Sequence, residues 1–372
     1  MLTNDDRKVV SFLDLLRVGL WEKDELITHH EKIDYRYIYQ LSNEQAVIGL
    51  IAAGLDSCSV ELQDSSRFDI LGRTLQIEQC NIAMNQFVAD LFKKLQSKKI
   101  NAILVKGQGI AQCYERPLWR NNGDVDLLLD EDNYIKAVSY LSSFADSEDE
   151  EVASRLHYGF KIGPWVVELH GTLRGHLYNA IDCELDAVQN EMVSKKQYKV
   201  WNNDGVDILL PSPNNDVIIV FTHTLQHFSQ VGVGLRQVCD LCRLLWVYHK
   251  EIDSSLLSER FSRMGLMTVW KTFGAMMVNH LGLPKESFPL YDDSARYKKK
   301  GDKVLQFILE VGNMGHNRDT SYTKKYPFVI SKIISFGRET KDFVRHFTIF
   351  PSYSMKVWGN LVKYGIRSVI AR

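Results

Sequence analysis

Two aspartates separated by a single residue are the side chains in this sequence best suited to chemistry. Asp124 and Asp126 lie in the run GDVDLLLD, whose alternating and then apolar pattern predicts a strand. Side chains two positions apart on a strand project from the same face, so the two carboxylates repel each other unless a cation lies between them. Mg²⁺ relieves such repulsion and commonly binds one or two carboxylates together with substrate phosphates. The spacing therefore predicts a Mg²⁺ site, with Mn²⁺ as the other candidate ion.

The surroundings of this pair favour phosphate chemistry. Gly123, directly before the pair, lets a phosphate or a metal-bound water approach the backbone closely. Upstream, Lys106 and Gly107 stand where the apolar run NAILV passes into a helical pattern, and the free N–H groups of a helix start can bind phosphate. Downstream, Glu168 lies in the apolar run VVELH, where an unpaired charge would be costly.

Two other phosphate-binding motifs are not supported by the sequence. The run GQGIAQ has two glycines of the dinucleotide fingerprint but carries Gln112 in place of the third. No GxxxxGK[ST] run occurs in the chain. Neither a Rossmann site nor a P-loop is therefore expected.

The elements that position these residues fall into three regions. Residues 1–95 have helical periodicity, residues 96–210 alternate between strand and helix patterns, and residues 211–372 are again helical in pattern. These ranges are the predicted N-terminal helical region, central core and C-terminal helical region. We therefore predict an α+β fold, with a mixed sheet and its helices flanked by helical regions.

Turn residues place the strands of the central region. Gly163-Pro164 separates HYGFKI from WVVELH, and Asp204-Gly205 separates KQYKVWNN from VDILLP, so each pair is expected to form a hairpin. Pro117 is expected to end the helix that follows Gly107.

Composition is that of an ordinary soluble globular protein. The chain has 372 residues, 45% of them hydrophobic and 24% charged, with a formal net charge of -1, so net charge indicates no partner. Its apolar runs fall short of the roughly 18 residues typical of a membrane span, and the N-terminus lacks the pattern of a secretory signal. Six scattered cysteines suit a reducing compartment. We expect a cytoplasmic protein without a transmembrane segment.

Several further side chains are candidates with ordinary structural alternatives. Lys106 and Arg120 are either phosphate contacts or partners in salt bridges. His170 should share a strand face with Glu168, and it either orients that carboxylate, touches substrate or is purely structural. Cys239 and Cys242 form a CxxC on one amphipathic helix, where packing is favoured over zinc.

Two pairs of side chains have helical i,i+4 spacing. His223 and His227 would meet on one helix face, where they could bind zinc, line the substrate cleft or pack between helices. Arg236 and Asp240 would form either an intrahelical ion pair or a substrate-facing pair. All four are second-tier candidates for the substrate cleft.

The sequence resembles the bacterial, uncharacterised nucleotidyltransferase-like proteins, within the superfamily that includes polymerase-β-like and antibiotic-adenylylating enzymes. The resemblance rests on ILVKGQGIAQCYERPLWRNNGDVDLLL and continues through VVELHGTL, HTLQHF and GLRQVCDLCRLL. It implies a nucleotidyltransferase-type sheet, with Asp124 and Asp126 as metal ligands and Gly107 facing the triphosphate. Glu168 matches the third-carboxylate position, where relatives often carry aspartate. Gln108 follows Gly107 in place of the more usual glycine or serine.

If the three carboxylates converge, the expected reaction is Mg²⁺-dependent transfer of a nucleoside monophosphate from a nucleoside triphosphate such as ATP, with release of pyrophosphate. The acceptor is open between a small molecule, a protein and an RNA. The alternatives are a catalytically silent nucleotide- or partner-binding module and an RNA-associated protein. Replacing Asp124 or Asp126 with asparagine is expected to abolish turnover and to leave metal-free stability unchanged or slightly raised.

The C-terminal stretch is basic. From about Tyr322 onward, lysines and arginines outnumber the acids Glu339 and Asp342, and aromatic residues are interleaved with them. This pattern fits either a helical bundle with a solvated basic face or a segment that binds RNA or a membrane surface.

Overall fold

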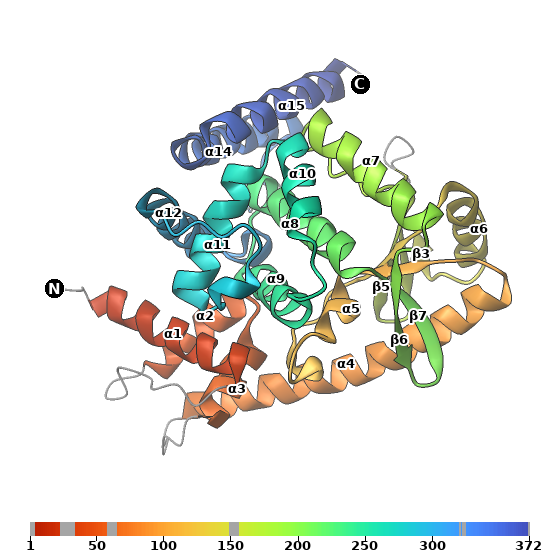
Figure 1. Ribbon diagram of the computed structural model, residues 1–372, viewed down its shortest axis with the longest axis horizontal. Helices are drawn as coiled ribbons and strands as arrows, with labels where there is room; N and C mark the ends of the chain where they lie inside the picture. Colours follow the sequence, from red (N-terminus) through yellow and green to blue (C-terminus); the bar gives the residue numbers. More distant parts are fainter. Residues whose placement is uncertain are drawn as a thin grey trace.

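A mixed β-sheet lies beside a larger assembly of helices in the computed structural model (Figure 1). The structure describes residues 4–22, 34–57, 65–148, 156–319, 321 and 325–370. The combination of a mixed sheet with many helices confirms the predicted α+β class.

The sheet has seven strands in the order β3-β4-β5-β2-β1-β7-β6. Their bounds are Ile103–Val105 (β1), Val125–Leu128 (β2), Ser147–Glu148 (β3), His157–Ile162 (β4), Trp165–His170 (β5), Tyr198–Asn203 (β6) and Val206–Pro211 (β7). β2 runs parallel to β5, and β1 runs parallel to β7, whereas the other neighbours are antiparallel. Short central strands thus lie between two hairpins.

Both predicted hairpins are confirmed. Ile162 pairs with Trp165 across the Gly163-Pro164 turn, and the β6–β7 hairpin closes over Asp204-Gly205. Gly163 has a φ of +59°, in the left-handed region that glycine enters without a Cβ clash. The turn position fixes which residues of the two strands face each other.

Helices before the sheet belong to two hydrophobic cores. They are α1 (Asn4–Trp21), α2 (Tyr35–Glu44), α3 (Ile48–Ser57) and α4 (Ser65–Ser97). Ile70 and Ile77 of α4 pack in the core of the helical assembly. Residues further along the same helix, including Val88 and Phe92, pack against the sheet. In Figure 1, α4 extends from α3 to the sheet.

The remaining helices surround the sheet and build the helical assembly. Those within the central region are α5 (Gly107–Ala111), α6 (Glu131–Ser142) and α7 (Asn179–Ser194). Those that follow it are α8 (Pro213–Gln230), α9 (Leu235–Tyr248), α10 (Ser254–Met264), α11 (Met267–Leu281), α12 (Ala295–Val311), α14 (Phe328–Ile349) and α15 (Pro351–Ile370). The prediction for Pro117 was wrong: α5 ends at Ala111, and Pro117 opens a separate 3₁₀ turn, where its fixed φ suits the first helical position.

The CxxC lies on α9, and both thiols are fully buried. Burial raises the pKa of Cys239 and of Cys242, so both stay protonated and pack as small apolar groups. Within the described chain, neither thiol belongs to a group of residues placed to hold a metal. Cys58 lies outside the described residues.

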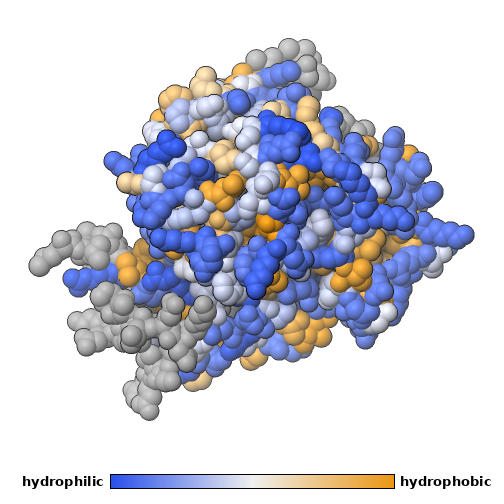
Figure 2. All heavy atoms as spheres, in the orientation of Figure 1, coloured by the Kyte–Doolittle hydropathy of each residue, from blue (hydrophilic) through white to orange (hydrophobic). Residues whose placement is uncertain are grey.

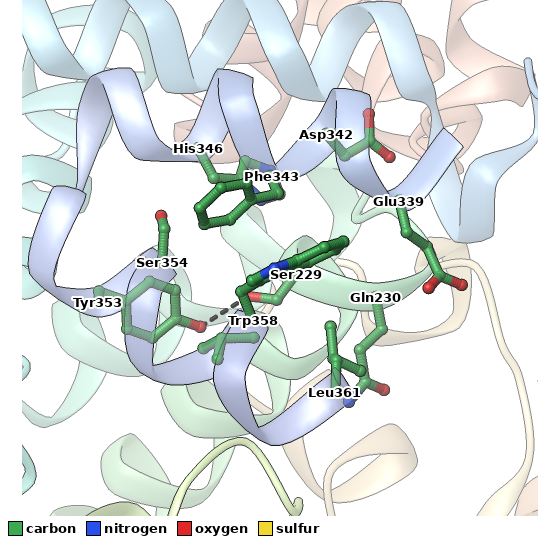
Figure 3. A pocket seen from close by; sticks show the side chains of 11 residues that line it. Ser229, Gln230, Glu339, Asp342, Phe343, His346, Tyr353, Ser354, Trp358 and Leu361 are labelled. Carbon is green, nitrogen blue, oxygen red and sulfur yellow. Dashed lines mark hydrogen bonds between the residues drawn. The ribbon is translucent and has the colours of Figure 1, made fainter. Parts of the chain in front are cut away.

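The C-terminal hairpin of α14 and α15 packs against the end of α8 (Figure 3). A small cavity of about 20 Å³ lies between them, and the hydroxyls of Ser229 and Tyr353 are 2.7 Å apart beside it. Phe343 of α14 stacks on Trp358 of α15, with ring centroids 4.9 Å apart, so these rings pack together within the hairpin. Of the basic stretch, Tyr322, Lys324 and Arg372 lie outside the described residues.

Much of the face drawn in Figure 2 is hydrophilic, with separate hydrophobic patches. Exposed apolar side chains include Ile333, Val344 and Phe347 of α14. Among the described residues, every helix is too short or too polar to cross a membrane.

His346 gives the C-terminal hairpin an acid-sensitive contact. Its ring stacks on Phe228, and burial, with the nearby charges of Arg318 and Arg345, lowers its pKa from 6.5 to about 3. Below pH 6.5 this histidine becomes protonated in the unfolded chain but stays neutral in the folded chain, so stability is lost as the pH falls towards 3. We expect His346→Phe to remove about 2 kcal/mol of that loss between pH 7 and pH 4. Urea unfolding at both pH values measures it, and an equal stability difference at the two would contradict it.

Candidate active site

Strand register brings the three predicted carboxylates together. β2 lies between β1 and β5, with Asp126 opposite Val105 on one side and Glu168 on the other. Asp124 stands one residue before the first residue of β2. One carboxylate oxygen from each of Asp124, Asp126 and Glu168 can be chosen so that all three lie within 4.8 Å of one another. Asp126 and Glu168 therefore lie at the same level of the sheet, and Asp124 joins them from the loop that leads into β2.

Lys106 faces the carboxylates from the end of β1. Its Nζ lies 2.7 Å from Oδ1 of Asp126. Its backbone has φ 59° and ψ -146°, a conformation that is costly for any residue with a Cβ and that clusters at functional sites. Gly107, with φ +41°, follows directly, and a Cβ there would lie 3.5 Å from the carbonyl oxygen of Asp124. The β1–α5 turn thus holds a cation against the acids.

The three carboxylates have different electrostatic surroundings. Asp124 is partly exposed, yet burial of its carboxylate and the charges of Asp126 and Glu168 raise its pKa. Burial also opposes ionisation of Asp126, but Lys106 and His170 outweigh it and hold the pKa of Asp126 well below its usual range. A hydrogen bond with His157 lowers the pKa of Glu168. Asp124 is therefore the carboxylate with the most unrelieved negative charge.

Two histidines contact these carboxylates. Nε2 of His170 lies 2.8 Å from Oδ1 of Asp126, and Nε2 of His157 lies 3.1 Å from Oε2 of Glu168. His157 was missed in the sequence, although a usable signal was present. Counting back from the Gly163-Pro164 turn pairs Ile162 with Trp165 and, five steps later, His157 with His170.

A cleft of about 340 Å³ opens beside this cluster. Its walls come from the strand ends, the loop after β5, α7, α8 and one residue of α15. The lining residues are Val105, Lys106, His157, Glu168, His170, Thr172, Leu173, Arg174, Gly175, His176, Leu177, Ile181, Leu185, Ile219, Thr222, His223, Gln226, His227, Gln230 and Leu361. The cleft is thus polar around the carboxylates and apolar along α7.

His223 and His227 line the cleft from α8. Their Nε2 atoms lie 2.9 Å apart. Burial lowers the pKa of His223 and lowers that of His227 to about 4, so both rings are neutral at pH 7. In the part of the chain that the structure describes, neither belongs to a group of three side chains able to hold a metal. Of their three sequence-based interpretations, the cleft-lining one matches this position.

Arg120 and Asp240 form a buried pair away from the cleft. Nε and one terminal nitrogen of Arg120 each donate to a different oxygen of Asp240, at 2.7 Å, and the hydroxyl of Tyr114 donates to Asp240 at 2.7 Å. One of the two predicted alternatives was an intrahelical ion pair of Arg236 with Asp240, and it is not among the ion pairs of the described residues. Instead, the planar guanidinium of Arg120 binds both carboxylate oxygens of Asp240. Arg120 therefore braces the loop before the aspartates.

Arg236 of α9 also contacts the loop before the aspartates. One of its terminal nitrogens donates to the backbone oxygens of Asn121 and Asn122, at 3.3 and 3.0 Å. A Cβ at Gly123 would lie 3.6 Å from that nitrogen. Arg236 is thus placed to position the loop that leads into Asp124.

Gln108 is also turned away from the cleft. Its side-chain amide donates to Asn85 at 2.7 Å and to Asn81 at 3.3 Å, both on α4. It therefore fastens the β1–α5 turn to α4. Of the residues predicted to contact nucleotide, only Lys106 lines the cleft.

Comparison with known protein families identifies the family of this chain. A family model described as "uncharacterised nucleotidyltransferase" matches residues 31–280, more than half of the chain. The chain belongs to this family. The match covers the three carboxylates, Lys106 and most of the cleft lining, and it confirms the family expected from the sequence.

The family member is also similar to one solved structure, an antigenic nucleotidyltransferase-like protein from Paracoccidioides brasiliensis. The two chains are 18% identical, with a TM-score of 0.30, over 44% of this chain and 75% of that one. A comparison with curated proteins gives no match.

Proposed function

We propose that this family member is a Mg²⁺-dependent enzyme that transfers a nucleoside monophosphate from a nucleoside triphosphate to an acceptor, releasing pyrophosphate. The observation that carries the proposal is the convergence of Asp124, Asp126 and Glu168 within 4.8 Å at the edge of a cleft. A cytoplasmic location and ATP as the triphosphate are part of the proposal.

The donor set fits a hard divalent ion. Asp124, Asp126 and Glu168 offer oxygen atoms only, which is the ligand type that Mg²⁺ and Mn²⁺ prefer. These three residues would hold the ion. When bound, Mg²⁺ supplies positive charge to the phosphate oxygens and to the attacking acceptor oxygen.

Lys106 would bind the triphosphate. Its ammonium group lies on the cleft wall and already contacts Asp126, so binding a phosphate requires only a short movement of a flexible side chain. α5 has only five residues, so its helix dipole is small. The main positive charge beside the carboxylates is therefore the ammonium group of Lys106.

Glu168 would take a proton from the acceptor in addition to holding the ion. It is ionised, because hydrogen bonding to His157 lowers its pKa, and it lines the cleft where an acceptor hydroxyl or amine would lie. His170 would orient Asp126 through the 2.8 Å contact of their side chains. The rest of the cleft, towards α7 and α8, is the proposed acceptor site.

A catalytically silent nucleotide- or partner-binding module is the second candidate. The contact of Lys106 with Asp126 favours it, because that ion pair already satisfies the most buried acid without a metal. Of the aromatic residues on which the RNA-associated alternative rests, Phe343 and Trp358 stack on each other, whereas Phe347 is exposed.

Pyrophosphate release distinguishes these functions. The purified chain is incubated with Mg²⁺, each of four nucleoside triphosphates and a cell extract as the source of acceptors, and labelled products are identified by mass spectrometry. We expect Mg²⁺-dependent pyrophosphate release with the label attached to an acceptor. Nucleotide binding without turnover would select the binding module, and absence of Mg²⁺-dependent nucleotide binding would contradict both candidates.

A further inference from the structure

A second set of possible metal ligands lies next to the oxygen cluster. His157, Glu168 and His170 each offer one ligand atom, and these atoms lie within 4.8 Å of one another. Nε2 of His157 is 3.1 Å, and Nε2 of His170 is 3.5 Å, from Oε2 of Glu168. When several ligand atoms each lie about 2.0 to 2.2 Å from one ion, the distances between those ligand atoms are close to these two values. The two separations from Glu168 thus match those around a single ion, and the two histidine nitrogens lie within 4.8 Å of each other.

The sheet fixes this arrangement. His157 and His170 are directly opposite on the antiparallel strands β4 and β5, with ring centroids 4.8 Å apart. Glu168 is two residues from His170 on the same strand face, and the residue opposite it on β4 is Gly159. Glycine brings no side chain to that position, and His157 contacts the carboxylate from β4.

The chemistry of this second set differs from that of the first. Two imidazole nitrogens and one carboxylate favour borderline transition ions such as Zn²⁺ or Co²⁺, whereas Mg²⁺ avoids nitrogen. All three side chains line the cleft, so an ion there would keep open positions for water or for a substrate.

We propose that His157, Glu168 and His170 form a transition-metal site that prefers Zn²⁺ or Co²⁺ to Mg²⁺. The site shares Glu168 with the oxygen cluster and extends the metal chemistry of the cleft towards the proposed acceptor side. Binding the ion takes Nε2 of His170 from its 2.8 Å contact with Asp126. It rests on the proposed function only through that shared carboxylate, since binding needs neither nucleotide nor turnover.

Metal binding without nucleotide tests the proposal. The full chain, stripped with a chelator, is dialysed against Zn²⁺ in the presence of excess Mg²⁺, and bound zinc is counted by elemental analysis. The visible spectrum of Co²⁺ reports whether imidazole is a ligand. The variants are His157→Gln and His170→Gln, and His227→Gln is the matched control, because it removes one imidazole from the same cleft but outside the set. Thermal unfolding shows that each variant folds.

We expect about one Zn²⁺ per chain, retained in excess Mg²⁺ and in His227→Gln. His157→Gln and His170→Gln should each weaken binding at least tenfold, as a rough measure, and remove the Co²⁺ spectrum. Equal binding in all four proteins, equal loss in His227→Gln, or no Zn²⁺ bound by the parent would overturn the site.

Asp124→Asn separates this proposal from the proposed function. Asp124 belongs to the oxygen cluster but not to the histidine set. The variant should therefore keep its Zn²⁺ while losing nucleotidyl transfer. A parent that binds Zn²⁺ at the histidines but never turns over would sustain the metal site and remove the enzyme assignment, and turnover without Zn²⁺ binding would do the reverse.

Discussion

Asparagine at position 124 or 126 should lower nucleotidyl transfer by about a thousandfold or more, because either change removes a carboxylate from the proposed metal site and the transition-state charge stabilisation that depends on it. Asn keeps the shape of Asp, so the loss reports charge. Initial rates of pyrophosphate release with a fixed triphosphate and saturating Mg²⁺ measure the effect. Turnover at the parent rate in both variants would remove the enzyme assignment.

The same two variants should differ in stability without metal. Asp124→Asn relieves repulsion from Asp126 and Glu168, so its free energy of unfolding should be unchanged or slightly raised. Asp126→Asn removes the partner of Lys106 and should cost about 3 kcal/mol. The sequence alone predicted no loss for either variant. For Asp126 the structure corrects that expectation, because its carboxylate is buried in an ion pair.

The pH dependence has a definite sign for Asp126. Its pKa in the folded chain lies below the ordinary value of 3.8, so its ion pair stabilises the fold above pH 3.8 and loses that contribution as the pH falls further. The free energies of unfolding of the parent and of Asp126→Asn are measured in urea, with chelator present, at pH 7 and pH 3. The difference between the two proteins should be smaller at pH 3. An unchanged gap would contradict the assigned ion pair.

Arg120→Met should produce the largest loss of stability away from the carboxylates, about 3 to 5 kcal/mol, because it leaves Asp240 as an unpaired buried charge. Arg116→Met is the matched control: Arg116 also pairs with acids, Glu22 and Asp56, but its side chain is 30% exposed. For that surface pair we expect about 1 kcal/mol or less.

Urea unfolding of the two variants measures this difference at neutral pH. Arg120→Lys adds a second comparison, because lysine keeps the charge but cannot donate to both oxygens of Asp240. The free energy of unfolding of Arg120→Lys should lie between those of the parent and Arg120→Met. Equal losses at positions 116 and 120 would show that burial of the Arg120 pair does not determine its contribution.

Local patterns were enough to predict the two hairpins and the aspartate pair, whereas the role of Glu168 as third carboxylate came from the family resemblance. Gly163-Pro164 fixed one hairpin, and the apolar runs around Asp126 and Glu168 identified strands that the structure places side by side. Strand alternation then put Asp124 and Asp126 on one face. These inferences succeed because turn chemistry and side-chain alternation act over only a few residues.

Such local patterns could not predict contacts between side chains that are far apart in the sequence. Arg120 and Asp240 are 120 positions apart, and only the packing of α9 near the loop before β2 brings them together. Sequence spacing favoured Arg236 as the partner of Asp240, since the two lie on one helix face. Likewise, Gln108 is in a turn that looked suited to phosphate, but its amide binds α4 instead. Which partner a long polar side chain takes depends on tertiary packing.

The position of α4 limits how modular this protein can be. One helix of 33 residues supplies Ile70 and Ile77 to the helical core and Val88 and Phe92 to the sheet core. An excised segment of residues 96–210 would keep the acidic residues but lack the hydrophobic layer that α4 places on the sheet. A cut between α4 and β1 would separate the acidic residues from the helix that packs against their sheet. The smallest unit expected to keep the acidic residues on a folded surface is therefore the sheet together with α4.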